Sequence, residues 1–209
     1  NKNSIKIIGD NTALYSQAYF AYDSKKAGGA TRSNLRFGKS PIRSTYYIKN
    51  ADFISCSLDS YLFRYDMLRN LKKGGTFLLA TTYSVEEMEK HLPKRVKKQL
   101  ADKAAKFYII DATTIAESIG MGRRTNTILQ SSFFALNPQI LPYEEAITLM
   151  KKAAKKSYGK KGDEMVQLNY KAIDMGKEGL VEVPVNPEWS SLELGNTRIT
   201  TGDEYFDEH

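Results

Sequence analysis

Short apolar runs alternate with amphipathic stretches between residues 51 and 120. The apolar runs are ADFISCSL (51–58), TFLLATT (76–82) and KFYIIDAT (106–113). Runs of this length and composition are typical of strands buried in a parallel sheet, and the stretches between them then form the crossing helices of βαβ units. This part of the chain therefore predicts an α/β domain with three buried parallel strands.

Two helical connections are expected between these strands. The first covers residues 59–75, where a glycine pair closes a helical stripe of apolar side chains, namely Leu62, Tyr65, Met67 and Leu68. The second begins at Ser84, because Glu87 follows three residues later in the pattern of a capping box. Pro93 interrupts this helix, and a lysine-rich helix follows it.

The ends of the chain have different patterns. Residues 13–24, 31–38 and 40–48 predict three strands of a hairpin-type meander. A short helix is expected to end at Gly120. Amphipathic patterns then predict a largely helical second half, with helices over residues 125–140, 142–162 and 163–180. Pro142 is expected at the first helical position of the helix over 142–162.

Taken together, these elements predict the fold class: a three-layer α/β/α domain with a mixed, partly parallel sheet and a helical C-terminal half. The domain is expected to cover residues 1–185. Residues 186–209 show no periodic pattern and are interpreted as an extended linker or tail laid over another surface.

Composition and charge narrow the functional classes. The hydrophobic share of 41% and the charged share of 26% are ordinary for a soluble globular protein, and no apolar stretch is long enough to span a bilayer. The net charge of +7 favours an anionic partner, which the charge alone leaves open among nucleic acid, a phosphorylated ligand and an acidic protein face. Much of the excess lies in residues 94–106 and 150–162, which are interpreted as solvated helix faces. Because the chain has no zinc-finger spacing and no aromatic RNA-binding strand, no nucleic-acid partner is expected.

The cysteine and histidine content excludes several kinds of site. The chain contains one cysteine, Cys56, and two histidines. It therefore has no internal disulfide framework and too few ligands for an all-protein zinc or iron–sulfur site. Cys56 lies within an apolar run and is interpreted as an inert buried thiol, and a single cysteine suits a reducing, cytoplasmic compartment.

Ligands of open parallel sheets bind beyond the carboxyl ends of the strands. The candidate segments are therefore CSLDS (56–60), TTYS (81–84) and the long segment 111–127. The last places Arg123 and Arg124 beside glycines and before Asn126 at a helix start, an arrangement that suits phosphate groups. The arginines could instead form ion pairs with acidic residues.

A second basic turn precedes these segments. Ser24, Lys25 and Lys26 run into the glycine pair Gly28–Gly29, where a ligand could approach the backbone closely. A solvated hairpin is the alternative interpretation. Of the acidic residues near the third strand, Asp111 and Glu117 are interpreted as helix caps or ion-pair partners, so the chain is not expected to hold a complete active site and no catalytic residue is assigned.

Four quoted segments carry a resemblance to a known family: YDSKKAGGATRSNLRFGKSPIRSTYYI, NLKKGGTFLLATTYSVEEMEKHLP, KFYIIDATTIAESIGMGRRTNTILQSSFF and YGKKGDEMVQLNYKAID. In this order they resemble domain III of the single-chain pyruvate:ferredoxin (flavodoxin) oxidoreductases, the equivalent of the gamma subunit of multi-subunit 2-oxoacid oxidoreductases. The resemblance implies oxidative decarboxylation of pyruvate with coenzyme A to acetyl-CoA and CO2, with electrons passed to ferredoxin or flavodoxin. It implies that thiamine diphosphate, Mg2+ and [4Fe-4S] clusters are held by other domains.

The resemblance also implies roles for this chain within the larger enzyme. The domain would bind coenzyme A and pack between other domains without catalysing the reaction by itself. The implied coenzyme A contacts are Ser24, Lys25, Lys26, Arg123, Arg124 and Asn126. The alternative is a purely structural scaffold between the thiamine-binding domains, with no ligand of its own. The intact enzyme is expected to be a homodimer, not bound to a membrane, in the cytoplasm or in an organelle such as a hydrogenosome.

Two departures from the family pattern bear on the ligand site. Family members usually open this domain with a strand and a glycine-rich turn, and this chain is expected to lack both, which would leave a vacant sheet position and a weakened site. The segment CSLDSY (56–61) also stands where many relatives carry a His-Asn-Pro-Ser-Tyr type of segment. No ligand role is therefore assigned to it.

Overall fold

The computed structural model describes residues 6–7, 15–22, 31–38 and 50–195. The chain divides into two compact units. Unit 1 comprises residues 1–48 and 126–177, and unit 2 comprises residues 49–125 and 178–209.

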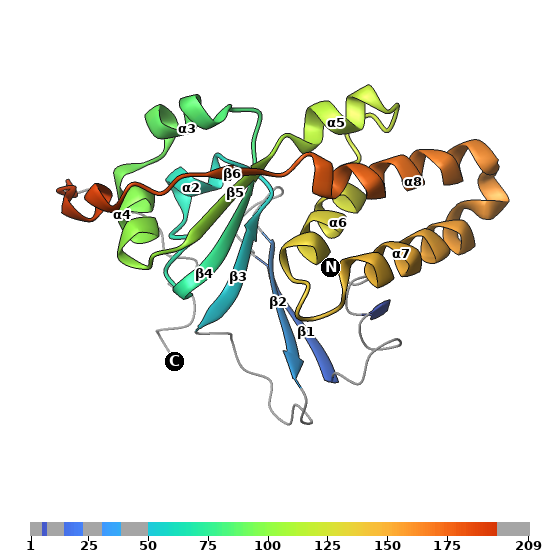
Figure 1. The fold of residues 1–209 in the computed structure, drawn as a ribbon, viewed down its shortest axis with the longest axis horizontal. Helices are drawn as coiled ribbons and strands as arrows, with labels where there is room; N and C mark the ends of the chain where they lie inside the picture. Colours follow the sequence, from blue (N-terminus) through green and yellow to red (C-terminus); the bar gives the residue numbers. More distant parts are fainter. Residues whose placement is uncertain (1–5, 8–14, 23–30, 39–49, 196–209) are drawn as a thin grey trace. The chain divides into compact units, whose positions relative to one another are not determined.

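Unit 2 is built on a four-stranded sheet (Figure 1). Its strands are β3 (Ala51–Cys56), β4 (Leu71–Ala80), β5 (Lys106–Ile110) and β6 (Val181–Val183), in that spatial order. The first three run parallel, and β6 pairs antiparallel with β5. The predicted mixed, partly parallel sheet is therefore confirmed.

The helices of unit 2 connect these strands. They are α2 (Tyr61–Arg64), α3 (Val85–His91), α4 (Lys94–Asp102) and α5 (Ala112–Ser118), followed after β6 by the 3-10 helix η2 (Pro187–Ser191). The predicted capping box is present at α3. The Ser84 hydroxyl accepts from the Glu87 amide at 3.2 Å, and the Glu87 carboxylate accepts from the Ser84 amide at 3.1 Å.

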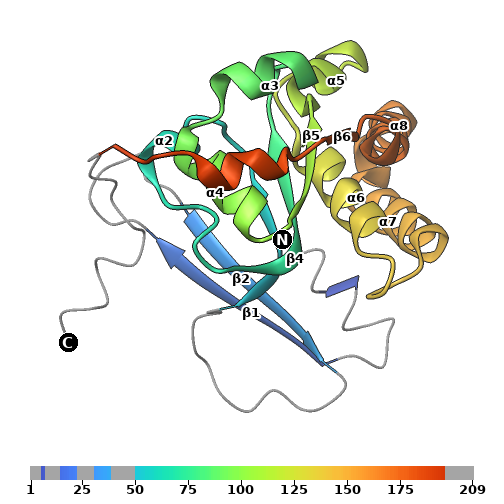
Figure 2. The same ribbon diagram turned by 60° about the vertical axis from the view of Figure 1, so that its left-hand side comes forward.

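The core of unit 2 lies between the sheet and these helices. Phe77 of β4 and Phe107 of β5 stand opposite each other in register and stack with ring centroids 5.4 Å apart. Val96 and Leu100 of α4 pack into the same core, and so does Trp189 of η2. Figure 2 shows the red segment after β6, which contains η2, running beside α4. The domain boundary expected at residue 185 stays a prediction, but Trp189 shows that η2 is part of this core.

The predicted helix over residues 59–75 is wrong beyond its first turn. α2 ends at Arg64, and β4 begins at Leu71 and runs through both glycines. The register with β3 shifts at this point, because Ala51 pairs with Leu71 and Phe53 pairs with Thr76. β4 therefore has three more residues than β3 between these pairs, and they form a bulge, which Gly74 permits with a φ of +75°.

Side chains of α4 and of Lys103, the residue directly after it, explain why α2 stops at Arg64. Arg95 donates to the carbonyls of Leu62 and Tyr65, at 3.3 and 3.0 Å. One turn further, Gln99 donates to the Asp66 carboxylate, and after another turn Lys103 donates to the carbonyls of Leu68 and Arg69. Arg95, Gln99 and Lys103, here called the α4 ladder, thus supply donors that a helix over 65–70 would have supplied itself.

The α4 ladder also corrects the interpretation of residues 94–106 as a solvated face. β3 differs from its prediction as well: of its six residues only Cys56 is buried, because β3 lies at the edge of the sheet described here. Burial is much more complete in β4, where the consecutive residues Phe77, Leu78 and Leu79 are fully buried, as expected for a strand covered on both faces.

Unit 1 contains an antiparallel strand pair. β1 (Tyr15–Tyr22) pairs with β2 (Thr31–Gly38), and the register runs from Tyr15 opposite Gly38 to Tyr22 opposite Thr31. These two predicted strands are confirmed. The third strand predicted for the meander, over residues 40–48, lies outside the described residues.

The C-terminal part of unit 1, from residue 126 on, is largely helical, as predicted. It contains α6 (Asn126–Leu136), α7 (Tyr143–Tyr158), the 3-10 helix η1 (Gly159–Lys161) and α8 (Asp163–Glu178). Pro142 stands at the N-cap of α7, one position before the expected one. Ser131 and Ser132 of α6 donate to the α8 carbonyls of Ile173 and Gly176, so hydrogen bonds join these two helices.

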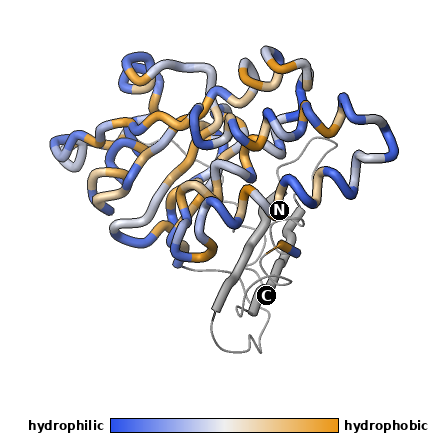
Figure 3. The backbone as a smooth tube through the Cα atoms, turned by 45° about the vertical axis from the view of Figure 1, so that its right-hand side comes forward, coloured by the Kyte–Doolittle hydropathy of each residue, from blue (hydrophilic) through white to orange (hydrophobic). Residues whose placement is uncertain are grey.

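The apolar side chains of α6, α7 and α8 form a second core. Its buried members are Ile7, Phe134, Leu141, Ala146, Ile147, Met150, Ala154 and Ile173. Hydrophobic and hydrophilic positions alternate along these helices, as the coloured tube in Figure 3 shows. Over the part of the chain that the structure describes, no helix is long and apolar enough to cross a membrane.

Candidate ligand-binding site

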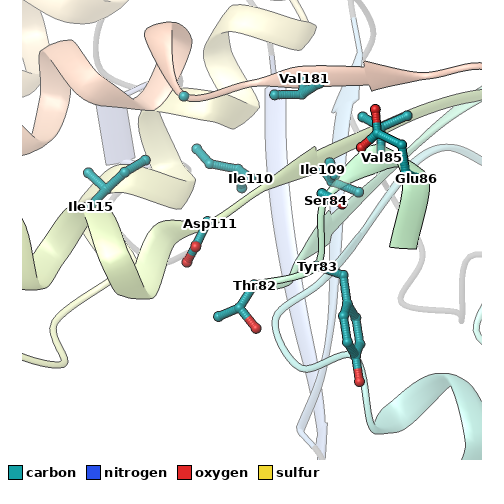
Figure 4. A pocket seen from close by; sticks show the side chains of 11 residues that line it. Thr82, Tyr83, Ser84, Val85, Glu86, Ile109, Ile110, Asp111, Ile115 and Val181 are labelled. Atoms are coloured by element: carbon teal, nitrogen blue, oxygen red, sulfur yellow. The ribbon is translucent and has the colours of Figure 1, made fainter. Parts of the chain in front are cut away.

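A pocket of about 420 Å³ lies in unit 2 at the carboxyl ends of β4 and β5 (Figure 4). Its location is the one predicted for ligands of a parallel sheet. The lining residues come from the loop after β4, the start of α3, the end of β5, the start of α5 and the entry to β6. They are Thr82, Tyr83, Ser84, Val85, Glu86, Ile109, Ile110, Asp111, Ile115, Gly179 and Val181.

The polar groups of this pocket are hydroxyls and carboxylates. Asp111 caps α5, because its carboxylate accepts from the Thr114 amide at 3.0 Å, as the sequence predicted. Glu86 lies in the first turn of α3. Tyr83 extends away from the other lining side chains in Figure 4, and its ring stacks on His91 at 4.2 Å. Two carboxylates make the pocket itself unsuited to phosphate groups.

The segment CSLDS, after β3, is fixed by hydrogen bonds of its own. Thr81 donates to the Asp59 carboxylate at 2.9 Å, and the Thr81 hydroxyl accepts from the Tyr83 amide at 3.2 Å. The Cys56 thiol donates to the Leu58 carbonyl at 3.0 Å. Burial raises the pKa of Cys56 to about 11, so the thiol stays protonated and unreactive near neutral pH. The expected burial of Cys56 is confirmed, and the raised pKa agrees with its interpretation as an inert thiol.

The arginine-containing segment begins where α5 ends. The Gly120 amide donates to the Glu117 carbonyl at 3.2 Å, and the Met121 amide donates to the Ala116 carbonyl at 2.8 Å. This pair of bonds is a Schellman motif, with Gly120 at a φ of +87°. Met121 is buried, so the motif ties the following turn to the body of unit 2.

Arg123 and Arg124 follow this anchor, and both are exposed. The backbone amide of Arg124 and its side-chain Nε both donate to the Met121 carbonyl, at 3.2 and 3.4 Å. Arg123 forms no ion pair with any residue that the structure describes. The Arg123 side chain is therefore exposed to solvent, and the backbone of its turn is anchored by buried Met121.

The other predicted contacts have different outcomes. Asn126 is exposed and begins α6, as the sequence predicted. Ser24, Lys25 and Lys26 lie outside the described residues, so a grouping of the lysine turn with the arginine turn stays a prediction.

The pocket and the arginine turn are separate features of unit 2. Neither arginine lines the pocket, and α5 connects the two, with Asp111 before its start and Gly120 after its end. Sequence reasoning identified the loop after β4 and the start of α5. It missed Gly179 and Val181, which reach the pocket only because β6 adds antiparallel to β5.

Comparison with known proteins identifies the family. The profile described as pyruvate ferredoxin/flavodoxin oxidoreductase matches residues 1–179. The chain belongs to this family. It is 50% identical over 207 residues to the pyruvate:ferredoxin oxidoreductase of Moorella thermoacetica, which covers 99% of this chain and 18% of that protein. The chain thus spans less than a fifth of the length of this relative.

Solved structures confirm the fold of this chain. The gamma subunit of a keto/oxoacid ferredoxin oxidoreductase from Geobacter sulfurreducens matches with a TM-score of 0.58 at 16% identity, covering 84% of this chain and 83% of that one. A 2-oxoglutarate:ferredoxin oxidoreductase from Magnetococcus marinus also matches with a TM-score of 0.58 at 16% identity, covering 95% of this chain and 30% of that one. The latter was solved with 2-oxoglutarate, coenzyme A and succinyl-CoA bound. The gamma-type α/β architecture expected from the sequence is confirmed.

Proposed function

We propose that this chain is the coenzyme A-binding domain of a pyruvate:ferredoxin (flavodoxin) oxidoreductase. The complete enzyme oxidatively decarboxylates pyruvate with coenzyme A, releases acetyl-CoA and CO2, and reduces ferredoxin or flavodoxin. The proposal is supported by 50% identity to a pyruvate:ferredoxin oxidoreductase along nearly the whole chain. It is also supported by the fold shared with a related enzyme that was solved with coenzyme A bound.

The cysteine content of this chain does not fit an iron–sulfur cluster. A [4Fe-4S] cluster requires several cysteine thiolates, and the whole sequence has one cysteine, which is buried and protonated. Among the described residues, no three His, Cys, Asp or Glu side chains come together as metal ligands. We therefore assign the iron–sulfur clusters, thiamine diphosphate and Mg2+ to other domains of a dimeric enzyme.

The observation that carries the coenzyme A assignment is the anchored arginine turn. Coenzyme A has three phosphate groups, and guanidinium groups bind phosphate oxygens through paired hydrogen bonds. Each such charged hydrogen bond contributes about 1.5–3 kcal/mol. A turn fixed by the Schellman motif and by buried Met121 loses little freedom when a ligand binds, so more of this energy appears as affinity.

The other proposed contacts complete the site. Lys25 and Lys26 neutralise phosphate charge as point charges, while Ser24 and Asn126 orient the ligand through hydrogen bonds. Holding coenzyme A in one orientation lowers the entropic barrier for the attack of its thiol on the reaction intermediate that the other domains hold.

The test compares coenzyme A with dephospho-coenzyme A, which lacks the 3′-phosphate, in the complete enzyme. Arg123→Ala is expected to raise the KM for coenzyme A about tenfold, as loss of about 1.4 kcal/mol of binding energy would. If Arg123 contacts the 3′-phosphate, the same substitution changes the KM for dephospho-coenzyme A much less. An equal increase for both compounds assigns Arg123 to the diphosphate.

Arg64→Ala is the matched control, because Arg64 is also exposed and the same charge is removed. Its KM for coenzyme A is expected to stay at the wild-type value. The scaffold alternative predicts something different: neither Arg123→Ala nor the double substitution Lys25→Ala with Lys26→Ala would change the KM for coenzyme A. That result would overturn the proposed role of this domain.

A further inference from the structure

Exposed lysines gather where α7 ends and η1 follows it. Lys152, Lys155, Lys156, Lys160 and Lys161, here called the α7 lysine cluster, are all exposed. The opposite side of α7 packs into the core of unit 1. Figure 1 shows α7 and α8 running side by side to a common connection, so the cluster lies at the tip of a helix pair.

Most of these lysines have no partner among the described residues. Neighbouring Lys151 pairs with Asp174 at 2.8 Å, and Lys161 lies over the Tyr158 ring at 5.8 Å. Lys152, Lys155, Lys156 and Lys160 form no ion pair or hydrogen bond within the described part of the chain.

Little acidic charge offsets the cluster. Over residues 150–164 the sequence has six lysines and two carboxylates, Asp163 and Glu164. The two carboxylates lie in the first turn of α8, where its helix dipole favours them. The tip therefore carries an excess of positive charge that the fold itself does not use.

The chemistry of this surface favours a transient complex with an acidic protein. Unneutralised charge of one sign attracts partners of the opposite sign and accelerates their association. The large exposed hydrophobic side chains of the described residues, Leu58, Phe63, Val181 and Leu194, belong to unit 2 and not to this tip. Without an apolar centre the surface lacks what holds permanent interfaces together. The cluster also lacks the arginines and base-stacking pattern of a nucleic-acid site.

We propose that the α7 lysine cluster is the docking surface for the acidic face of the protein that accepts electrons from this enzyme. The proposal rests on the proposed function, which makes a small electron-carrier protein an obligatory partner. Electrostatic steering suits such a partner, since the carrier must bind, take up an electron and leave on every turnover.

The experiment uses the complete enzyme with Lys155→Gln, Lys156→Gln and Lys160→Gln combined. Glutamine keeps the helix propensity of lysine and removes only its charge. The control combines Lys73→Gln, Lys90→Gln and Lys94→Gln, which are exposed lysines of unit 2, so both variants lose three charges. Each enzyme is assayed with pyruvate and coenzyme A, once with ferredoxin and once with methyl viologen, a small dye that needs no protein docking.

For the cluster variant, kcat/KM for ferredoxin is expected to fall about tenfold at low ionic strength, and the difference should shrink as salt screens the charges. Its rate with methyl viologen is expected to equal the wild-type rate. The control variant is expected to reduce ferredoxin nearly as well as the wild type.

Two results would overturn the docking proposal alone. One is an unchanged kcat/KM for ferredoxin in the cluster variant, and the other is an equal fall in the control, which would show an effect of net charge. A wild-type enzyme that reduces neither acceptor with pyruvate and coenzyme A would instead overturn the proposed function and the docking proposal with it.

Discussion

Two lysine-rich segments with nearly the same composition have different roles in this molecule. Residues 94–106 and residues 150–162 each contain six cationic side chains, and both form amphipathic helices. In the first segment, Arg95 of α4 and Lys103 directly after it donate to backbone carbonyls of the segment after α2, and Lys98 donates to the Ser190 carbonyl. At the end of α7, most of the lysines have no partner among the described residues.

The difference comes from the backbone that lies against each helix. α4 faces the irregular segment 65–70 and the short helix η2, whose carbonyls lack partners in a regular ladder. α7 lies beside α8, whose interior carbonyls already accept hydrogen bonds within a regular helix. Cationic side chains of a helix therefore stabilise the fold only where neighbouring segments contain backbone carbonyls that lack a hydrogen-bond donor of their own.

The strongest test of this comparison is Arg95→Ala. Removing the Arg95 guanidinium leaves the carbonyls of Leu62 and Tyr65 without their side-chain donor. We therefore expect the free energy of unfolding to fall by about 2–3 kcal/mol. Chemical denaturation of the chain measures this change. Lys94→Ala, at the neighbouring exposed position, should change stability by less than about 0.5 kcal/mol. Equal effects of both substitutions would contradict the structural role of Arg95.

Lys103→Met tests the far end of the α4 ladder. Removing the ammonium group should destabilise the fold by about 1 kcal/mol, because Lys103 is partly exposed and water replaces some of its hydrogen bonds. Methionine retains the length of the apolar stem.

The shifted pKa of Lys103 is expected to make the free energy of unfolding depend on pH. Burial lowers the pKa of Lys103 from its ordinary value of 10.5. The unfolded chain then holds this proton more tightly than the folded chain, so the contribution of Lys103 to stability should rise as the pH increases toward 10.5. Comparing unfolding of the wild type and Lys103→Met at pH 8 and pH 10 checks the sign. A contribution that falls over this range would contradict it.

Ala104→Gly should stabilise the chain by about 0.5–1 kcal/mol. Ala104, two residues after the end of α4, has a φ of +46°. This left-handed conformation is unfavourable for residues other than glycine. This turn lets the Lys103 carbonyl accept from the Gly74 amide at 2.7 Å and so connects α4 to the β4 bulge. Thermal unfolding measures the gain, and Ala101→Gly, within the helix, provides a control that should destabilise.

The smallest effect is expected for the α7 lysine cluster. Combined substitution of Lys155, Lys156 and Lys160 by glutamine should change the free energy of unfolding by less than about 0.5 kcal/mol, because no described residue binds these lysines. Denaturation in low and high salt measures the change. A loss comparable to that of Arg95→Ala would mean that both lysine segments serve the fold.

Elements whose signals are local were predicted correctly from the sequence. The capping box at Ser84, the buried runs that became β4 and β5, and the amphipathic helices α7 and α8 all depend on residues within a few positions of each other. The helix over 59–75 failed because its end is decided by Arg95 and Lys103, about thirty positions away. No local pattern contains that information.

The candidate site divides in the same way. The exposed arginine turn and the Asp111 cap follow from glycine spacing and strand order, which the sequence displays. The pocket wall at Gly179 and Val181 depends on where β6 joins the sheet, and the exposure of β3 depends on its place at the edge. Such features arise from pairing between distant segments, which periodicity cannot specify.

The caps at the two ends of α5 give that helix a fixed length. Asp111 sets its first residue beside the pocket, and Gly120 with Met121 sets its last turn before the arginines. Because each residue of a helix advances the chain by about 1.5 Å and rotates it by about 100°, deleting one uncharged residue from the middle of α5 would keep both caps and all the charges. It would nevertheless turn Arg123 and Arg124 by more than a quarter of a circle about the helix axis. The number of residues in α5 thus determines the direction in which the arginine turn faces.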